Sequence, residues 1–514
     1  MNSFLKELAI QLYNQYQAGL SDITLVFPNR RAGLFFRKHL SEVIHSPVWA
    51  PGIVSMEDFI NGYSELQIAD NLTLIFLLYD EYLKVNPKVE SFDRFYSWGE
   101  IMLKDFDDID KYLINSDHLF TSIKELKELE ARFDYLTKEQ IAVIKSFWSS
   151  FGANPSSQQQ GFLTIWELLP KIYKNFRERL AKENIAYEGL IYRAIAEKTA
   201  SGYHIPNNKK IIFAGFNSLS TSEERIIKYF INDHKAEIVW DVDRSYIEDP
   251  NLEAGIFLRR YYKDKIFGKF FPTPLPVRLQ VGKEKKIEII GVPLAVGQAK
   301  KLGDKLANLI DNRNLNDLTK TVVVLPEEVL LFPVLHSLPG AIADINVTMG
   351  YPLKDTSLNS FFEHLLTFQQ QESIITNGVI HFHHKSLLSL LKHPLFLQYN
   401  SALSIKVVAE IEKNNIIYVP SSLLKQNDAL YSKVFRKVRS TRELLDYLID
   451  IILIFNQSME GNNKEESQRE QGQANDVSFL EERSLKAQEL EKEYIYQFYA
   501  LLNRLKAIII DQKI

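Results

Sequence analysis

Residues 209–230, KKIIFAGFNSLSTSEERIIKYF, decide the fold of this chain. An apolar run at 211–213 predicts a buried strand, and the amphipathic segment that follows predicts a helix with Ser220 or Thr221 as its N-cap. Turns between a strand and a helix are where α/β proteins place catalytic acids and phosphate ligands. The turn of this chain reads Ala214, Gly215, Phe216, Asn217. It holds no carboxylate, so the sequence predicts the framework of a nucleotide site without its catalytic groups.

Similar strand and helix patterns recur on both sides of this stretch and predict an α/β fold with two cores. Before and after it, apolar runs at 23–27 and 236–243 predict further strands of a first core. Later in the chain, runs at 285–292 and 320–326 flank a helical pattern at 295–310. This order predicts a second strand–helix–strand unit.

Helical periodicity in the rest of the chain predicts large insertions into both cores. The expected parts are a first α/β core over 1–56 and 205–270, a helical insertion over 57–204, a second α/β core over 271–365 and a second helical insertion over 366–514. Within the last part, residues 460–476 are rich in charged and amide side chains and nearly free of apolar ones. This composition predicts a disordered loop.

Composition limits the classes of function. The 514 residues contain no cysteine, which excludes disulfides, thiolate metal sites and a cysteine nucleophile within this chain. The net charge of −4 means that binding of a polyanion depends on local basic patches. The amphipathic N-terminus does not fit a secretory signal, and no apolar run is long enough to cross a bilayer. We therefore expect a soluble cytoplasmic protein that does not contact membranes.

Several strand-to-turn segments resemble motifs of superfamily I helicases, whose plan is also two α/β cores with helical insertions. LVFPNRRAGLFFRKHL (25–40) is similar to the motif that touches the nucleic-acid backbone, with Asn29, Arg30 and Arg31 at matching positions. The helix expected at 30–44 has Leu34, Phe35 and Leu40 on its apolar side.

The motifs that carry helicase chemistry are degenerate. Ala214 and Gly215 stand where the family has its magnesium-binding Asp and catalytic Glu. IVWDVDRSYIED (238–249) resembles the third motif, in which Asp241 matches and Arg244 replaces the phosphate-sensing glutamine. No Gly-Lys-Ser/Thr occurs in the chain, so the phosphate cradle is missing. These losses imply degenerate RecA-like cores without ATPase activity, without a catalytic residue and without a cofactor.

This pattern resembles the inactivated helicase half of AddB-type proteins, the B subunits of bacterial helicase–nuclease recombination complexes, in the variety found in Bacteroidetes. The resemblance covers about residues 20 to 400 and implies a noncatalytic DNA-binding module in double-strand-break repair, with a helicase or nuclease subunit as its partner. Family members continue into a PD-(D/E)xK nuclease, which is not recognisable here. The resemblance thus leaves two alternatives open, the scanning portion of a longer exodeoxyribonuclease and a scaffold that binds a partner helicase without touching DNA.

Basic clusters are the candidate contacts to single-stranded or forked DNA. The candidates are Asn29, Arg30, Arg31, Arg37, Lys38, Arg259 and Arg260. A helix N-terminus with adjacent arginines suits phosphate. The first cluster could also be a solvated helix face, or Arg30 and Arg31 could pair with acidic residues of the helical insertion, which is rich in Asp and Glu between 100 and 140. Near the second cluster, Tyr261 and Tyr262 could stack on bases or pack in a core.

Two polar groups invite a metal interpretation that we do not adopt. Asp241 and Asp243 follow a strand at a spacing of two, but such pairs more often end a strand or cap a turn. His381 and His383 would share one face of a strand, but no carboxylate or cysteine lies near them in the sequence. The sequence therefore predicts no metal site.

Overall fold

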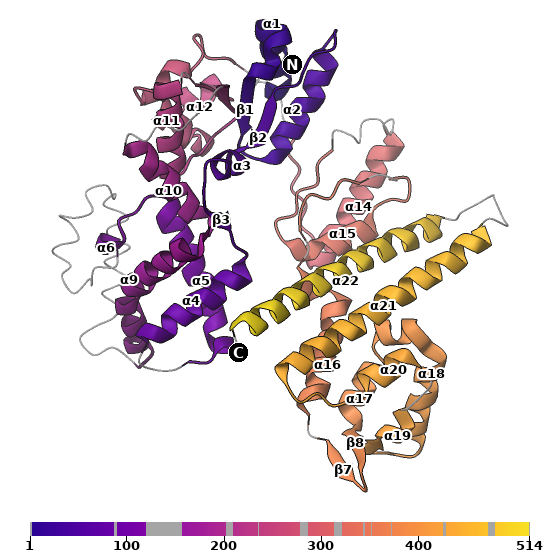
Figure 1. Ribbon diagram of the computed structural model, residues 1–514. Coiled ribbons are helices and arrows are strands. Elements are labelled where there is room, and N and C mark those ends of the chain that lie inside the picture. Colours follow the sequence, from indigo (N-terminus) through magenta and orange to yellow (C-terminus); the bar gives the residue numbers. More distant parts are fainter. Residues whose placement is uncertain are drawn as a thin grey trace. The chain divides into compact units, whose positions relative to one another are not determined.

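The computed structural model describes most of the chain (Figure 1). The described residues are 3–86, 90–119, 157–201, 209–234, 236–277, 286–312, 321–342, 345–350, 352–371, 373–424, 428–470 and 479–512. The chain divides into two compact units, Met1–Lys285 and Lys286–Ile514. This division falls later than the expected domain boundary at residue 271.

The first unit is built on a four-stranded parallel sheet. Its strands lie in the order β2 (Gly52–Ser55), β1 (Ile23–Phe27), β5 (Lys210–Ala214) and β6 (Glu237–Val239). In the register of the sheet, Val26 of β1 is opposite Val54 on one side and Phe213 on the other. The expected α/β class, with a parallel sheet and helical insertions, is confirmed.

Helices cover both faces of this sheet because its strands are apolar at consecutive positions. On one face, α1 (Phe4–Tyr16) and α2 (Arg30–Val43) pack over Leu25 and Ile212 (Figure 1). On the other face, α3 (Met56–Asn61) and α11 (Thr221–His234) meet Phe213. There the ring of Phe59 lies 5.5 Å from that of Phe213 and 5.2 Å from that of Phe230, edge to face.

The expected insertion is mainly helical in its described residues. It contains β3 (Gln67–Ile68), α4 (Asn71–Val85), α5 (Phe92–Lys111), α6 (Ser116–Leu119), α9 (Ser157–Glu183), β4 (Ile185–Ala186) and α10 (Glu188–Ala200). A buried polar network joins three of these elements: Tyr173 of α9 and Tyr187 before α10 both donate to the carboxylate of Asp110 on α5. Arg193 of α10 places its Nε 2.6 Å from the same carboxylate.

After β6 the chain folds back on the first unit. It forms α12 (Arg244–Glu248), η2 (Glu253–Gly255), α13 (Ile256–Lys263) and η3 (Phe267–Phe270). The indole of Trp240 is stacked between the rings of Tyr261 and Phe271, each 5.2 Å away. The carbonyl of Pro276 accepts a hydrogen bond from the Arg244 N–H. The proline-rich segment up to residue 277 therefore packs with the first unit.

The second unit is mainly helical and includes a small antiparallel sheet in the order β7–β8–β9. Its elements are α14 (Ala295–Asn312), η5 (Glu328–Leu330), α15 (Leu331–Ser337), η6 (Leu353–Asp355), α16 (Ser357–Gln370), β7 (Ile374–Thr376), β8 (Val379–His383), α17 (His384–Leu391), α18 (Pro394–Lys413), β9 (Tyr418–Pro420), α19 (Ser421–Leu424), α20 (Ala429–Val434), α21 (Thr441–Glu470) and α22 (Phe479–Gln512). The two longest helices, α21 and α22, run side by side (Figure 1).

The second α/β core differs from its prediction. The predicted helix forms as α14, but the described parts of the two predicted strands, 286–292 and 321–326, belong to no sheet. The backbone groups of both segments form no strand ladder. Apolar sequence alone cannot make a strand, because a strand also needs a neighbour to receive its hydrogen bonds.

The prediction of a disordered loop at 460–476 is wrong for its first part. Helix α21 continues to Glu470, and residues 471–476 lie outside the described part of the chain. Glu, Lys, Gln and Arg are good helix formers, so a polar stretch can extend an amphipathic helix that is already anchored.

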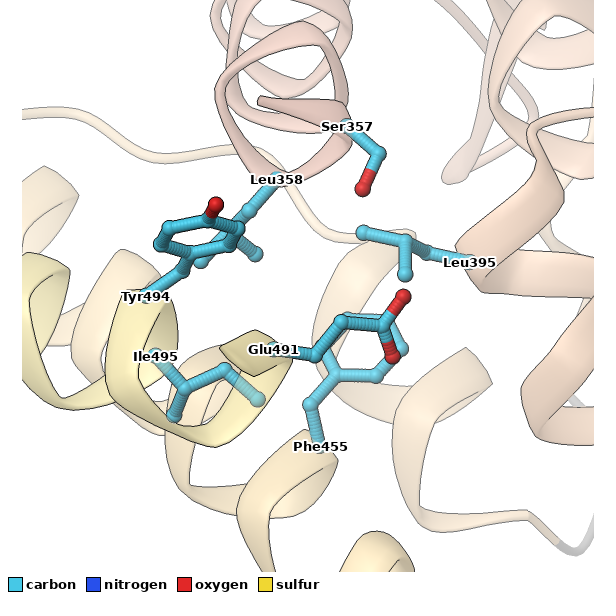
Figure 2. Close-up of a pocket in the computed structure, with 7 residues that line it drawn as sticks. All are labelled: Ser357, Leu358, Leu395, Phe455, Glu491, Tyr494 and Ile495. Carbon is cyan, nitrogen blue, oxygen red and sulfur yellow. The ribbon is translucent and has the colours of Figure 1, made fainter. Parts of the chain in front are cut away.

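Helices α16, α18, α21 and α22 meet around a small hollow (Figure 2). It is lined by Ser357, Leu358, Leu395, Phe455, Glu491, Tyr494 and Ile495. Its volume of about 10 Å³ suits a single water molecule. Burial raises the pKa of the Glu491 carboxyl. The hollow is too small for a ligand and is part of the helix packing.

Candidate nucleic-acid interface

The carboxyl ends of β1 and β5 meet at the point where the order of the sheet reverses. From β1 the chain passes through α2 to β2 on one side, whereas from β5 it passes through α11 to β6 on the other. Open α/β sheets bind their ligands outside the strand ends at such a switch point. The structure thus brings together two groups of predicted site residues, Asn29 to Arg31 after β1 and Ala214 with Gly215 at the end of β5.

The β5 end is poorly suited to a catalytic side chain. Gly215 has φ 75°, in the left-handed region that favours glycine, and its N–H donates to the carbonyl of Val239. A Cβ at this position would lie 3.2 Å from Cε1 of Phe4 in α1. Ala214 is fully buried against the core under α1 and α2. A side chain at residue 215 would be strained by the backbone conformation and would need the Phe4 ring to shift, and a carboxylate at residue 214 would be buried in the apolar core.

The turn after β1 is held by side-chain hydrogen bonds. Asn29 caps α2, its Oδ1 accepting from the Ala32 N–H at 2.9 Å. Arg30 binds both oxygens of Asp58 in α3, at 3.0 and 2.7 Å, and Ser55 donates to the same carboxylate at 2.7 Å. The Arg30 guanidinium and the Ser55 hydroxyl lower the pKa of Asp58 to about 2.

Arg30 therefore pairs with an acid of the helical insertion, as one alternative expected, and this acid is Asp58 at the start of the insertion. Its side chain is still 75% exposed. A bidentate pair fixes the guanidinium plane, so Arg30 serves first to tie the end of β1 to α3.

The solvent side of α2 combines cations with apolar side chains. We define the α2 face as Arg31, Leu34, Phe35, Arg37 and Lys38, all of them exposed. The Arg31 guanidinium lies 5.9 Å from the centroid of the Phe35 ring. No acidic residue occurs between Arg30 and Leu40. The α2 face is therefore positively charged and carries an exposed aromatic ring.

Leu34 and Phe35 were expected on the apolar side of this helix, and this prediction is wrong. They are 63% and 42% exposed, and the buried residues are Gly33, Phe36 and Leu40. Gly33 lies close to Ile53 of β2, where a Cβ would be only 2.7 Å from the Ile53 side chain. The buried side of α2 could have been recognised from the spacing 33, 36, 40. This spacing is that of one helix face, and the glycine marks the closest approach of the helix to the sheet.

The second basic cluster divides into two roles. Arg259 donates to the backbone carbonyls of Tyr246, Asp249, Leu252 and Pro250 at 2.8, 2.8, 3.0 and 3.2 Å. Its guanidinium thus holds the loop between α12 and α13 together. Arg260 pairs with Glu224 of α11, lies 5.0 Å from the Tyr261 ring centroid and remains 56% exposed.

The neighbouring tyrosines also differ. Tyr261 is buried, and its hydroxyl accepts a hydrogen bond from the Leu219 N–H at 2.9 Å. It therefore packs in the core, whereas Tyr262 is 45% exposed. Within this cluster, Arg260 and Tyr262 are therefore exposed to solvent, whereas Arg259 and Tyr261 make structural contacts.

The motif after β6 is used for capping. Asp243 is 2% exposed and accepts from the Ser245 N–H at 2.8 Å, which starts α12. Asp241 is exposed, and Arg244 lies 3.9 Å from Glu248. In the part of the chain that the structure describes, no three His, Asp or Glu side chains are grouped to hold a metal ion.

The histidines around β8 contact backbone groups and neighbouring rings. His381 and His384 place their Nδ1 atoms 3.0 and 3.2 Å from the carbonyls of Val379 and Ile417. His383 lies between His384 and Tyr418 in a chain of ring contacts.

None of the described helices is both long enough and apolar enough to cross a membrane.

Neither the scan against protein-family models nor the search of curated proteins returns a match for this chain. A functional assignment therefore rests on the geometry at the switch point and on the α2 face.

Proposed function

We propose that this chain is a noncatalytic, helicase-like module that binds single-stranded or forked DNA, as the inactivated half of an AddB-type subunit would in recombinational repair. In this proposal the first unit is a degenerate RecA-like core. The observation that carries it is that two features lie at neighbouring strands. The end of β5 has no catalytic carboxylate, and the helix that follows β1 exposes basic and aromatic side chains.

The first support is the state of the β5 end. A nucleotide site at a switch point needs a phosphate cradle and a group to hold magnesium. Gly215 is in the left-handed conformation and Phe4 packs against it, so a carboxylate at this position would be strained and would need Phe4 to shift. The scaffold is thus suited to binding rather than to hydrolysis.

The second support is the charge distribution. The whole chain carries a net charge of −4, so general attraction to a polyanion is absent. Arg31, Arg37 and Lys38 nevertheless gather on one helix without an intervening acid. Phosphate contacts from such residues supply affinity that does not depend on sequence, and Phe35 adds a surface on which a base can stack.

A direct test measures ATP hydrolysis and DNA binding on one preparation. We expect no DNA-stimulated ATPase and no shift in melting temperature with ATP and magnesium. We expect binding of an oligo(dT) strand and of a fork, with an affinity that falls steeply as salt rises. A robust DNA-stimulated ATPase would contradict the proposal.

The exposed Leu34 and Phe35 also favour a second candidate, in which the α2 face binds a partner helicase or nuclease subunit and not DNA. Apolar residues at the centre of a polar rim are typical of protein interfaces. Failure of every DNA probe to bind, together with salt-insensitive binding of a partner subunit, would favour this scaffold. The proposed cytoplasmic location suits either candidate.

A further inference from the structure

Arg30 holds a carboxylate in the geometry with which guanidinium groups bind phosphate. Its Nε donates to Oδ2 of Asp58 at 3.0 Å, and its Nη2 donates to Oδ1 at 2.7 Å. An arginine binds carboxylate and phosphate through the same two parallel hydrogen bonds. The Asp58 carboxylate therefore occupies the two donors that a phosphate of a DNA backbone would use.

The pair lies at the start of the α2 face and is open to solvent. Arg30 is the first residue of α2, and Arg31, which belongs to the α2 face, follows it directly. The N-terminus of a helix favours an anion. The side chains of Arg30 and Asp58 are 75% and 36% exposed. A phosphate at the start of the α2 face can thus reach the Arg30 guanidinium from solvent.

Asp58 keeps other partners when Arg30 leaves it. The Ser55 hydroxyl donates to Oδ2 of Asp58 at 2.7 Å, and the Asp58 N–H donates to the Ser55 Oγ at 3.1 Å. These two bonds form the N-terminal cap of α3, where a negative charge is favoured. Exposed ion pairs are weak, and exchange of the carboxylate for a phosphate leaves no buried charge unpaired. The free-energy cost of the exchange is therefore small.

We propose that Asp58 restrains the DNA site by taking the place of a backbone phosphate on Arg30. The strand that binds the α2 face gains Arg30 as a further phosphate contact only by displacing Asp58. Because Asp58 is tethered by the fold, it competes at a high effective concentration, and Arg30 adds little to the affinity while the carboxylate is present. This inference rests on the proposed DNA binding of the α2 face.

Binding of fluorescent oligo(dT) to the full chain over a salt series, followed by anisotropy, tests the proposal. Asp58→Asn removes the charge and keeps the shape of the side chain. We expect it to tighten binding roughly fourfold at about 0.15 M salt and to steepen the salt slope by about 0.7, because one more phosphate contact releases further counterions from the single strand. Asp58→Ser, which also removes the carboxylate, should give the same gain. Asp58→Asn combined with Arg30→Ala should return the affinity and the slope to the values of the parent chain.

Two controls separate the release of Arg30 from other effects. Glu57→Gln removes an equal charge from the exposed residue next to Asp58 and should leave the salt slope unchanged. Ser55→Ala removes the cap of α3 but keeps the pair of Arg30 and Asp58. It should therefore lower the melting temperature without tightening the binding of DNA.

The possible results distinguish this inference from the proposed function. A parent chain that binds no oligo(dT) even at low salt overturns both. If the parent chain binds but Asp58→Asn leaves the slope unchanged, or if the gain persists without Arg30, Asp58 does not restrain the site, and DNA binding by the α2 face still stands. An equal gain from Ser55→Ala would assign the effect to a loosened α3 and would likewise reject the proposal.

Discussion

The ring of Phe4 packs against the position of a side chain at residue 215, because a Cβ on Gly215 would lie 3.2 Å from its Cε1 atom. The residue that begins α1 and the residue that follows β5 are far apart in sequence, and together they close the strand end. This relationship predicts how the site responds to substitution.

Gly215→Ala is expected to destabilise the first unit by about 1–2 kcal/mol, because an L-residue is strained at a φ of 75°. Gly378→Ala, in the turn between β7 and β8, is the matched control, since it shares the backbone strain (φ 76°) but has no atom within 4 Å of the new Cβ. Urea unfolding of both variants, with and without Phe4→Ala, measures the effect. Recovery of some stability by Phe4→Ala at residue 215 alone is the expected sign of the contact, and identical behaviour at both sites would contradict it.

Arg30 and Arg31 are expected to act differently despite being adjacent. Arg31→Ala together with Lys38→Ala should weaken binding of oligo(dT) and lower the salt slope by up to about two, because each phosphate contact releases roughly one counterion. Arg30→Ala should mainly lower stability, since its guanidinium is bound to Asp58. Fluorescence anisotropy over a salt series and thermal melts on the same samples separate these outcomes. A well-folded Arg31 and Lys38 variant with unchanged affinity would remove the α2 face from the DNA site.

The pair of Arg30 and Asp58 predicts a pH dependence with a definite sign. The pKa of Asp58 falls from 3.8 to about 2 in the folded protein, so the pair stabilises the fold above pH 3.8 and this contribution is lost as the pH falls toward 2. Because the pair is largely exposed, its contribution is expected to stay below about 1 kcal/mol. Unfolding free energies of the parent chain and of Asp58→Asn, measured between these pH values, should converge at the acid end. A difference that persists there would show that Asp58 acts through something other than its charge.

His393 predicts a second and distinct pH window in the second unit. It is buried, its Nδ1 accepts from the Leu395 N–H at the start of α18, and burial together with the nearby His364 lowers its pKa from 6.5 to about 4. The folded state thus holds the neutral ring, so stability is complete above pH 6.5 and falls by up to about 1.4 kcal/mol per pH unit between 6.5 and 4. His393→Asn keeps a capping side chain without the titration and should flatten this slope. An unchanged slope would assign the loss to other groups.

Asp110 is expected to be the least replaceable polar residue of the helical insertion. Removing its carboxylate by Asp110→Ala leaves Arg193 without its buried counter-ion and should cost about 3–5 kcal/mol. Asp108→Ala, an exposed site on the same helix, is the control. Replacing the pair by Asp110→Leu with Arg193→Met should recover part of the loss, and chemical denaturation of the three variants checks this order.

The sequence by itself determined the local elements of the first unit. The run at 211–213 and the predicted cap at Ser220, whose Oγ accepts from the Glu223 N–H at 3.3 Å, were sufficient to predict β5 and the start of α11, because these signals act between residues that are neighbours in the chain. The absence of carboxylates at Ala214 and Gly215 could likewise be seen in the sequence. These features need no knowledge of the rest of the molecule.

Only the tertiary structure decided which side chains meet. The ion pair of Arg30 with Asp58 and the contact of Phe4 with Gly215 each join separate elements, and no spacing in the sequence encodes them. The same reason applies to the apolar runs at 286–292 and 321–326, which have the composition of strands but join no sheet in the described residues. A helix satisfies its own backbone hydrogen bonds, whereas a strand depends on its neighbours. The helices of this chain could therefore be predicted from the sequence more reliably than the sheet of the expected second core.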